Sequence, residues 1–216
     1  MEILVDRINR VKKEALGYGA KLVIATKYLD LDDTKKLAEL GYLDLGANRV
    51  DTFLEKYEAL KDYNINWHFF GIVQSRRVRD LANKITCLHS LDRLSLAMEF
   101  DKRLEQPLDC FIEINIRDEE GRNGVSLTKA KALVKSISQK CKNIRIIGLM
   151  CVAKMTIDEE ELEREFSKVR KIKEEIEELG LENAPCHELS MGMSNDYQLA
   201  LMNGATLIRV GRMFFR

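Results

Sequence analysis

Along almost the whole chain, short apolar runs alternate with longer segments of helical periodicity, and this alternation narrows the folds open to the sequence. Such runs predict strands, and eight of them occur, over residues 22–26, 43–46, 67–71, 85–89, 110–116, 144–152, 186–189 and 206–210. Between them, helical periodicity covers residues 31–40, 50–61, 75–83, 92–104, 127–140, 158–179 and 195–203. One further helix is predicted ahead of the first strand, over residues 2–16.

Strands joined by helices are typical of parallel sheets, which either close into a barrel or stay open with helices on both faces. A set of eight strands favours a closed (β/α)8 TIM barrel, in which the N-terminal helix fills the eighth outer position. An open Rossmann-like sheet is the alternative, but no Gly-x-Gly-x-x-Gly motif follows the first strand. The chain has only Pro107 and Pro185 and no Gly/Ser-rich linker, so we expect a single domain over residues 1–216.

The charges balance, with 35 Lys and Arg residues against 35 Asp and Glu residues. The chain therefore lacks the basic excess that binds nucleic acid or an acidic membrane surface. No apolar run approaches the roughly 20 residues of a membrane-spanning helix, and the N-terminus lacks the apolar core of a secretory signal. The five cysteines have neither zinc-site nor redox-motif spacing, as expected of reduced thiols. We expect a cytoplasmic protein that binds neither nucleic acid nor membrane.

The carboxyl ends of the strands share one face of a barrel, where binding and catalytic groups gather. The seventh strand runs into Ser190-Met191-Gly192-Met193-Ser194, just ahead of the helix at 195–203. Two hydroxyls, backbone N–H groups and a helix N-terminus then lie together, an arrangement that suits a phosphate. Simple capping of the helix by Ser194 explains the same residues equally well.

Lys27 follows the apolar first strand, which lies next to the eighth strand in a closed barrel. A lysine that emerges from an apolar wall loses hydration, which favours the neutral amine that attacks carbonyls. A strand end that simply exits into solvent is the alternative. Beside a phosphate cup, Lys27 indicates a ligand with both a carbonyl and a phosphate. Pyridoxal 5′-phosphate fits this description, and so does a phosphosugar in a Schiff-base aldolase.

The three histidines, His68, His89 and His187, fall within apolar strands. Each could act in acid–base chemistry, but histidines packed or hydrogen-bonded in the core are the commoner outcome at such positions. No pair of histidines or carboxylates has the spacing of metal ligands, so the sequence predicts no metal site.

Several segments, taken together, resemble the YggS/PROSC-like pyridoxal phosphate homeostasis proteins. They are Val23-Ile24-Ala25-Thr26-Lys27, Gly46-Ala47-Asn48, Trp67-His68-Phe69-Phe70-Gly71, Gln74-Ser75, His89-Ser90-Leu91-Asp92-Arg93-Leu94, Ile114-Asn115, Gly148-Leu149-Met150, Leu189-Ser190-Met191-Gly192-Met193-Ser194 with Asp196, and Ile208-Arg209-Val210-Gly211. They are colinear and span nearly the whole chain. The resemblance implies the barrel of the alanine racemase N-terminal domain, with pyridoxal phosphate held as an internal aldimine.

The same resemblance implies that Lys27 forms the Schiff base and that Arg209 lies near the pyridine nitrogen. An arginine there disfavours protonation of the ring, which then is a weak electron sink. The cofactor-binding residues that it implies are Lys27, Asn48, His68, Met150, Ser190, Gly192, Met193, Ser194, Arg209, Gly211 and Arg212. We expect no catalytic residue and no metal ligand.

The chain departs from the family at two positions that bear on the site. Ala47 stands where the family carries a glutamate, and Arg212 stands where a small hydroxyl residue is usual. Arg212 either pairs with the phosphate or points away from it. We expect Arg212→Thr to change phosphate retention only modestly.

We therefore expect a non-enzymatic protein that holds pyridoxal phosphate for vitamin B6 and amino-acid homeostasis, with pyridoxal phosphate-dependent apo-enzymes as recipients. The alternative is a weakly active amino-acid racemase. Alanine racemase takes its second base from a further domain, which we expect to be absent because the sequence stops at Arg216. An aldolase is disfavoured because no acidic residue ends strands one, three, four or five. We expect a monomer or a weak homodimer.

Overall fold

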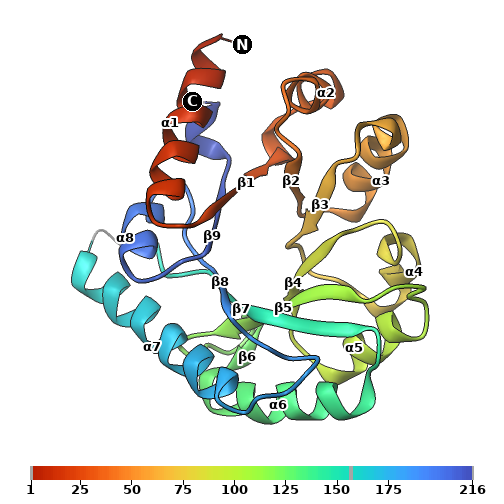
Figure 1. Ribbon diagram of the computed structural model, residues 1–216, viewed down its shortest axis with the longest axis vertical. Coiled ribbons are helices and arrows are strands. Elements are labelled where there is room, and N and C mark those ends of the chain that lie inside the picture. Colours follow the sequence, from red (N-terminus) through yellow and green to blue (C-terminus); the bar gives the residue numbers. More distant parts are fainter. Residues whose placement is uncertain (1, 156–157, 216) are drawn as a thin grey trace.

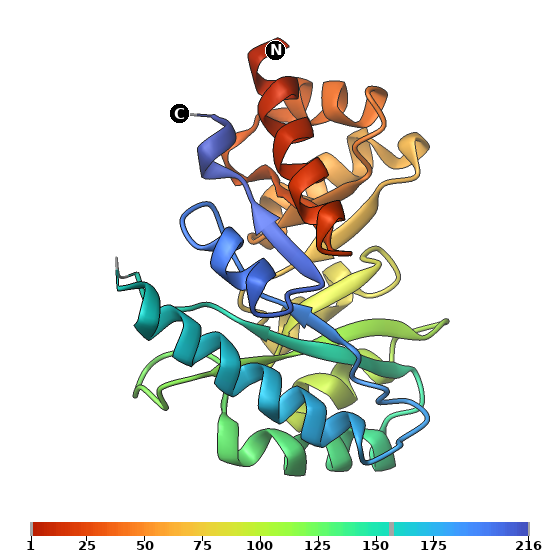
Figure 2. The same cartoon turned by 60° about the vertical axis from the view of Figure 1, so that its left-hand side comes forward.

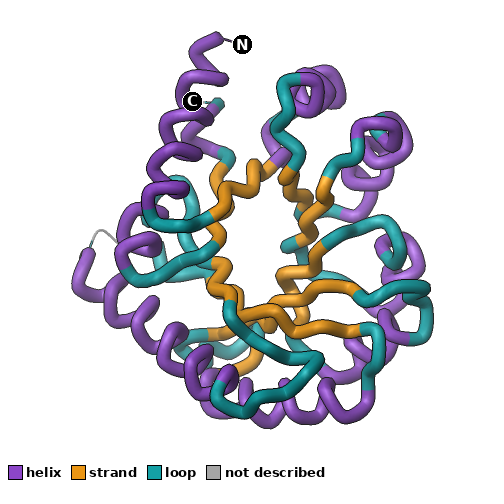
Figure 3. The backbone as a smooth tube through the Cα atoms, viewed as in Figure 1, coloured by secondary structure: helices purple, strands orange, loops and turns teal. Residues whose placement is uncertain are grey.

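The computed structural model describes residues 2–155 and 158–215. Eight parallel strands run in the order β4-β3-β2-β1-β9-β8-β7-β5, and pairing of β4 with β5 closes them into a barrel (Figures 1 and 3). Their bounds are β1 Lys21–Ala25, β2 Asp44–Ala47, β3 Asn66–Phe69, β4 Cys87–Leu91, β5 Leu108–Asn115, β7 Ile144–Cys151, β8 Glu188–Ser190 and β9 Leu207–Val210. The predicted closed barrel is confirmed, and the open sheet is wrong.

The helices form a ring outside the strands (Figures 1 and 2). They are α1 Glu2–Gly17, α2 Leu31–Glu39, α3 Val50–Ala59, α4 Val78–Leu81, α5 Leu94–Asp101, α6 Leu127–Lys140, α7 Glu159–Glu177 and α8 Tyr197–Met202. Glu14 of α1 accepts hydrogen bonds of 2.8 Å from Tyr197 and Gln198 of α8. The N-terminal helix therefore fills the eighth outer position, as predicted.

Several helices and strands in the structure differ in their bounds from those predicted from the sequence. The predicted strand 186–189 begins only at Glu188, because Cys186 has a positive φ of 51° that no strand accommodates. The predicted helix 75–83 is a 3-10 turn, Ser75–Arg77, followed by the single turn of α4. A short strand that the sequence did not predict, β6 (Val125–Ser126), pairs with the end of β5.

Alternation along each strand divides the buried side chains between two layers. On β5, Cys110 and Ile112 pack beneath the helices, whereas Phe111 points into the barrel beside Val23 and Met150. All five cysteines are buried and free of disulfides. Within the described residues, no helix has both the length and the apolar character needed to cross a membrane.

Candidate functional site

A cavity of about 710 Å³ opens at the carboxyl ends of the strands, where the barrel fold predicts it. Its wall carries four cationic side chains and one acidic side chain, and it therefore suits an anionic ligand. The residues that line it are Ala25, Lys27, Tyr28, Asn48, Phe70, Met150, Val152, Ala153, Lys154, Met155, Leu162, Met193, Ser194, Asn195, Asp196, Arg209, Gly211 and Arg212.

Two loops from neighbouring strands form the part of the wall that suits a phosphate. Ser194 and Asn195 follow β8, and Gly211 and Arg212 follow β9. A Cβ atom on Gly211 would lie 2.8 Å from the carbonyl oxygen of Ala25, so only glycine permits this approach of the two strand ends. The Arg212 guanidinium makes no hydrogen bond or ion pair with the described residues. The two loops therefore offer a hydroxyl and an unpaired cation to the cavity.

The loop after β8 differs from the predicted helix N-cap. The helix α8 begins at Tyr197, and the Ser194 hydroxyl accepts a hydrogen bond of 3.2 Å from the backbone N–H of Met213. The backbone N–H of Met193 donates to the Asp196 carboxylate at 2.5 Å. Capping of the helix by Ser194 is thus wrong, and the Met193 N–H is already occupied.

Gly192 lies behind this loop and not among the described residues that line the cavity. Its φ of +93° favours glycine, and a Cβ atom would come within 2.7 Å of Ala200. Its carbonyl oxygen accepts a hydrogen bond of 2.9 Å from the backbone of Arg209. Gly192 therefore sets the path of the loop and links β9 to it.

Lys27 lies on the cavity wall in the 3-10 turn Thr26–Tyr28 that follows β1. Its Nζ atom is 4.8 Å from the centre of the Tyr28 ring. Both side chains are exposed, so the expected loss of hydration at Lys27 is wrong for this structure. The 3-10 turn carries the side chain past the apolar strand to the rim, where a bound ligand would cover it.

Arg209 forms part of the cavity floor and is held from behind. Its Nη1 atom donates to Ser190 Oγ at 2.6 Å, and its Nη2 atom donates to the carbonyl oxygen of Cys151 at 2.9 Å. Burial lowers the pKa of Arg209, with nearby Cys151 and Asp196 acting in the opposite direction. Ser190 is fully buried and is not among the described residues on the cavity wall. It therefore supports Arg209 in this structure.

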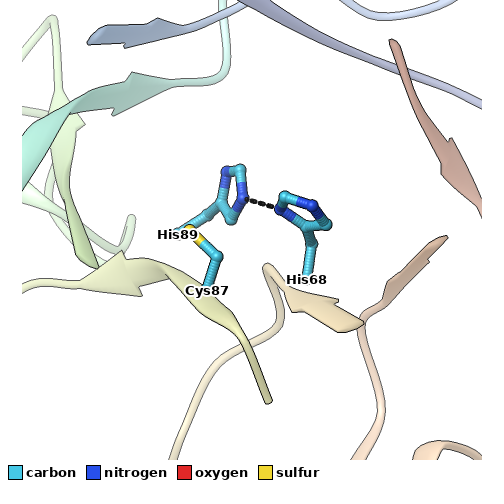
Figure 4. A group of neighbouring side chains, drawn as sticks. All are labelled: His68, Cys87 and His89. Atoms are coloured by element: carbon cyan, nitrogen blue, oxygen red, sulfur yellow. Dashed lines mark hydrogen bonds between the residues drawn. The ribbon is translucent and has the colours of Figure 1, made fainter. Parts of the chain in front are cut away.

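His68 also lies inside the barrel and not on the described wall of the cavity. Its Nδ1 atom is 2.9 Å from His89 Nε2, and its Nε2 atom is 3.4 Å from Asp44 Oδ1. This agrees with the expected hydrogen-bonded core histidine. Cys87 lies next to this pair (Figure 4), and one ligand atom from each of the three residues falls within 4.8 Å of the others. The sequence spacing did not reveal this potential metal-ligand cluster.

The structure thus brings most of the implied cofactor residues to one cavity. On its wall lie Lys27, Asn48, Met150, Met193, Ser194, Arg209, Gly211 and Arg212, whereas His68, Ser190 and Gly192 lie behind it. Sequence reasoning missed Tyr28, Phe70 and Asn195, which also line the cavity. Contact of any of these residues with a bound cofactor stays a prediction.

Glu113 is a further residue that the sequence analysis missed. Alternation with Phe111 turns it into the barrel, although two residues separate it from the end of β5. Burial and the charge of Asp92 raise the pKa of Glu113 to about 7, against the lowering effect of Arg209 and Arg122. The inward positions of β5 could have revealed this residue. Glu113 is not among the described residues on the cavity wall, so its raised pKa belongs to the interior of the barrel.

Comparison with known proteins shows the family to which the chain belongs. The family model of the alanine racemase N-terminal domain matches residues 3–216. A pyridoxal phosphate homeostasis protein of Aquifex aeolicus is 35% identical over 218 residues, covering 98% of this chain and 94% of that protein.

Solved structures support the same relationship. PipY of Synechococcus elongatus PCC7942, solved with PLP bound, is 27% identical with a TM-score of 0.82, covering 92% of this chain and 93% of that one. Alanine racemase from Corynebacterium glutamicum is 15% identical with a TM-score of 0.76, and the match covers 100% of this chain and 61% of that one. At this identity the likeness shows the shared fold alone. The chain belongs to the alanine racemase N-terminal domain family.

Proposed function

We propose that this chain binds pyridoxal 5′-phosphate in the cavity and holds it covalently on Lys27. The observation that carries the proposal is the composition of one cavity wall, which combines Lys27, the unpaired cation of Arg212 and the Ser194 hydroxyl. A cofactor with an aldehyde and a phosphate needs these groups together. The name of the Aquifex aeolicus relative and the PLP-bound PipY structure support the choice of ligand.

Seven residues on the wall have a role in this proposal. Ser194, Gly211 and Arg212 hold the phosphate, and Arg209 faces the ring nitrogen. Asn48 and Met150 pack against the cofactor from the side. The bound cofactor supplies an aldehyde, with which the Lys27 amine condenses with loss of one water.

We propose further that the protein binds this cofactor without turnover and passes it to pyridoxal phosphate-dependent apo-enzymes. Arg209, as a cation near the ring nitrogen, opposes the protonation that carbanion chemistry requires. Residues 1–216 would act as one binding domain, as a monomer or a weak homodimer. Five buried free thiols suit a reducing compartment such as the cytoplasm.

Borohydride reduction followed by peptide mass spectrometry tests the covalent bond. The expected result is one pyridoxyl group, carried by the peptide that contains Lys27. Lys154 also lines the cavity, so Lys154→Ala is a matched control that should keep the label, whereas Lys27→Ala should lose it. A label retained by Lys27→Ala would overturn the assignment.

The racemase alternative is tested separately. Tyr28 and Asp196 are acid–base groups on the cavity wall and could exchange the α-proton of an amino acid. Incubation of the loaded protein with alanine in deuterated water should give no α-proton exchange at rates typical of enzymes. Exchange at such rates, abolished by Lys27→Ala, would replace the carrier function with an enzymatic one.

A further inference from the structure

A chain of hydrogen-bonded side chains crosses the barrel interior from its amino-terminal end to the cavity floor. It runs from Asp44 at the start of β2 through His68, His89 and Ser190 to Arg209. The successive distances are 3.4, 2.9, 2.8 and 2.6 Å. Four of these residues are buried, and only Asp44 is half-exposed. The chain thus joins the solvent at one end of the barrel to the ligand cavity at the other.

The direction of each hydrogen bond follows from the residues at the two ends of the hydrogen-bonded chain, Arg209 and Asp44. Arginine can only donate, and an ionised carboxylate can only accept. Arg209 therefore donates to Ser190 Oγ, and His68 Nε2–H donates to Asp44. The bond from His68 is the main reason why the pKa of Asp44 is lowered. The hydrogens between these two ends then depend on the tautomers of the imidazoles.

With His68 neutral, its Nδ1 atom must accept, so His89 donates through Nε2–H. Burial, reinforced by His68 and Arg209, holds the pKa of His89 well below its usual range. Neutral His89 then accepts at Nδ1 from the Ser190 hydroxyl. Each of the four bonds has one hydrogen, and all of them point from Arg209 towards Asp44.

The same histidines could instead bind a metal ion together with Cys87 (Figure 4). Two observations favour the hydrogen-bonded chain. His68 Nδ1 and His89 Nε2 already bond to each other, and a metal would have to displace that hydrogen. Burial raises the pKa of the Cys87 thiol well above its usual value, which opposes the thiolate that a metal needs.

We propose that His89 is a positioning residue that orients Arg209 through the Ser190 hydroxyl, and that His68 sets the direction of the chain. The role of Arg209 at the cofactor ring rests on the proposed function, but the direction of the chain does not. His89 also stacks on Phe111, with ring centroids 4.5 Å apart, so the ring is fixed before any ligand binds.

A hydrogen on His68 Nδ1 would reverse the direction of these hydrogen bonds. His68 Nδ1–H would donate to His89 Nε2, His89 would carry its hydrogen on Nδ1, and Ser190 Oγ would accept from both neighbours. The Ser190 hydroxyl hydrogen would then lose its acceptor. The charged or titratable groups around this end of the barrel are Asp44 beside His68, Lys21 near Asp44, and Cys87, Asp109, Arg145 and Glu188 on the neighbouring strands.

Long-range ¹H–¹⁵N correlation spectra of the ligand-free protein test the direction of the chain. At pH 7.5 we expect the ring hydrogen of His68 and that of His89 both to lie on Nε2. His89→Phe assigns the signals and keeps the aromatic ring. An Nδ1–H tautomer or a charged ring at either residue at pH 7.5 would overturn the proposal.

Ligand affinity tests the positioning role. His89→Phe keeps the stack on Phe111 but removes both nitrogens, and it should raise the dissociation constant for pyridoxal phosphate about tenfold. His89→Asn keeps an acceptor for Ser190 and should recover most of that loss. Equal affinities for wild type and His89→Phe would overturn the role. If the wild-type protein itself binds no pyridoxal phosphate, the proposed function fails. The tautomers of His68 and His89 then still test the direction of the hydrogen-bonded chain.

Cys87→Ala is the matched control for the metal alternative, because it removes the third ligand and leaves the chain intact. We expect it to leave both tautomers unchanged, and we expect Zn²⁺ to leave the spectra of wild type unchanged. Stoichiometric Zn²⁺ binding that shifts both histidine signals and disappears in Cys87→Ala would replace the chain with a metal site.

Discussion

Lys56 holds the turn that carries Lys27. The Lys56 ammonium comes from α3, is buried, and donates hydrogen bonds to the carbonyl oxygens of Thr26 and Leu29 at 2.9 and 2.7 Å. These two carbonyls flank Lys27 in the sequence. Burial lowers the pKa of Lys56, so the fold accepts an unfavourable ammonium at this position. Lys56 thus fixes the backbone from which the Lys27 side chain reaches the cavity.

Lys56→Met should destabilise this turn because the Leu29 carbonyl loses its donor. We expect the free energy of unfolding to fall by about 2 kcal/mol, as measured by urea denaturation. The borohydride-dependent label at Lys27 should decrease at a fixed low concentration of pyridoxal phosphate. Lys36→Met changes a half-exposed lysine on α2 and should leave both measurements unchanged. If Lys56→Met has the stability and the Lys27 label of the wild type, the two hydrogen bonds from Lys56 are not needed to hold the turn.

Glu113 should make the stability depend on pH. Because its pKa in the folded chain is raised from 4.5 to about 7, the folded state keeps a proton that the unfolded state releases between these values. Stability therefore falls as pH rises from about 4.5 to about 7. At 1.36 kcal/mol per unit, the loss approaches about 3 kcal/mol. Glu113→Gln should remove this slope from urea midpoints measured between pH 5 and pH 8.

Asp92→Asn separates the two causes of this effect. Burial is the larger cause of the raised pKa of Glu113, and the charge of Asp92 is the second. Removal of that charge should lower the pKa of Glu113 and make the pH slope smaller without abolishing it. An unchanged slope in Glu113→Gln would show that another group titrates in this range.

Asp196 should control the shape of the loop after β8. Its carboxylate accepts the hydrogen bond from the Met193 backbone, and burial raises its pKa against the effect of that bond. Asp196→Ala leaves the Met193 N–H without this acceptor, so we expect pyridoxal phosphate to bind about tenfold more weakly. Asp196→Asn keeps an acceptor oxygen and should bind nearly as wild type does. Fluorescence titration of the cofactor measures both. Equal weakening in the two variants would point to the charge of Asp196.

Arg212→Thr should weaken binding of pyridoxal phosphate more than the sequence alone predicts. The structure places Arg212 on the cavity wall beside Gly211, where the guanidinium can reach a phosphate. We expect about a tenfold loss of affinity at low salt and a smaller loss at high salt, because ions screen an accessible charge pair. Arg79→Thr alters an exposed arginine on α4 and serves as the control. Equal affinity of Arg212→Thr and wild type would remove Arg212 from the phosphate site.

The two serines of the predicted phosphate cup show how far sequence reasoning reached. The pattern put Ser190 and Ser194 at the end of one strand, and the structure confirms this place for both. The structure then separates them, because Ser190 points into the barrel towards His89 while Ser194 lies on the cavity wall. Ser190 is the last residue of β8, and the pairing of β8 with β7 and β9 sets the direction of its side chain, whereas Ser194 lies in the loop that follows.

The sequence by itself determined the alternation of strands and helices, and with it the closed barrel and the place of Lys27 after the first strand. Those features depend on hydrophobic periodicity, which each segment carries locally. Only the tertiary structure decided that His89 contacts Ser190, 101 residues away, and that burial raises the pKa of Glu113. These contacts depend on the register and closure of the barrel, which bring together side chains from strands whose own sequences do not specify their partners.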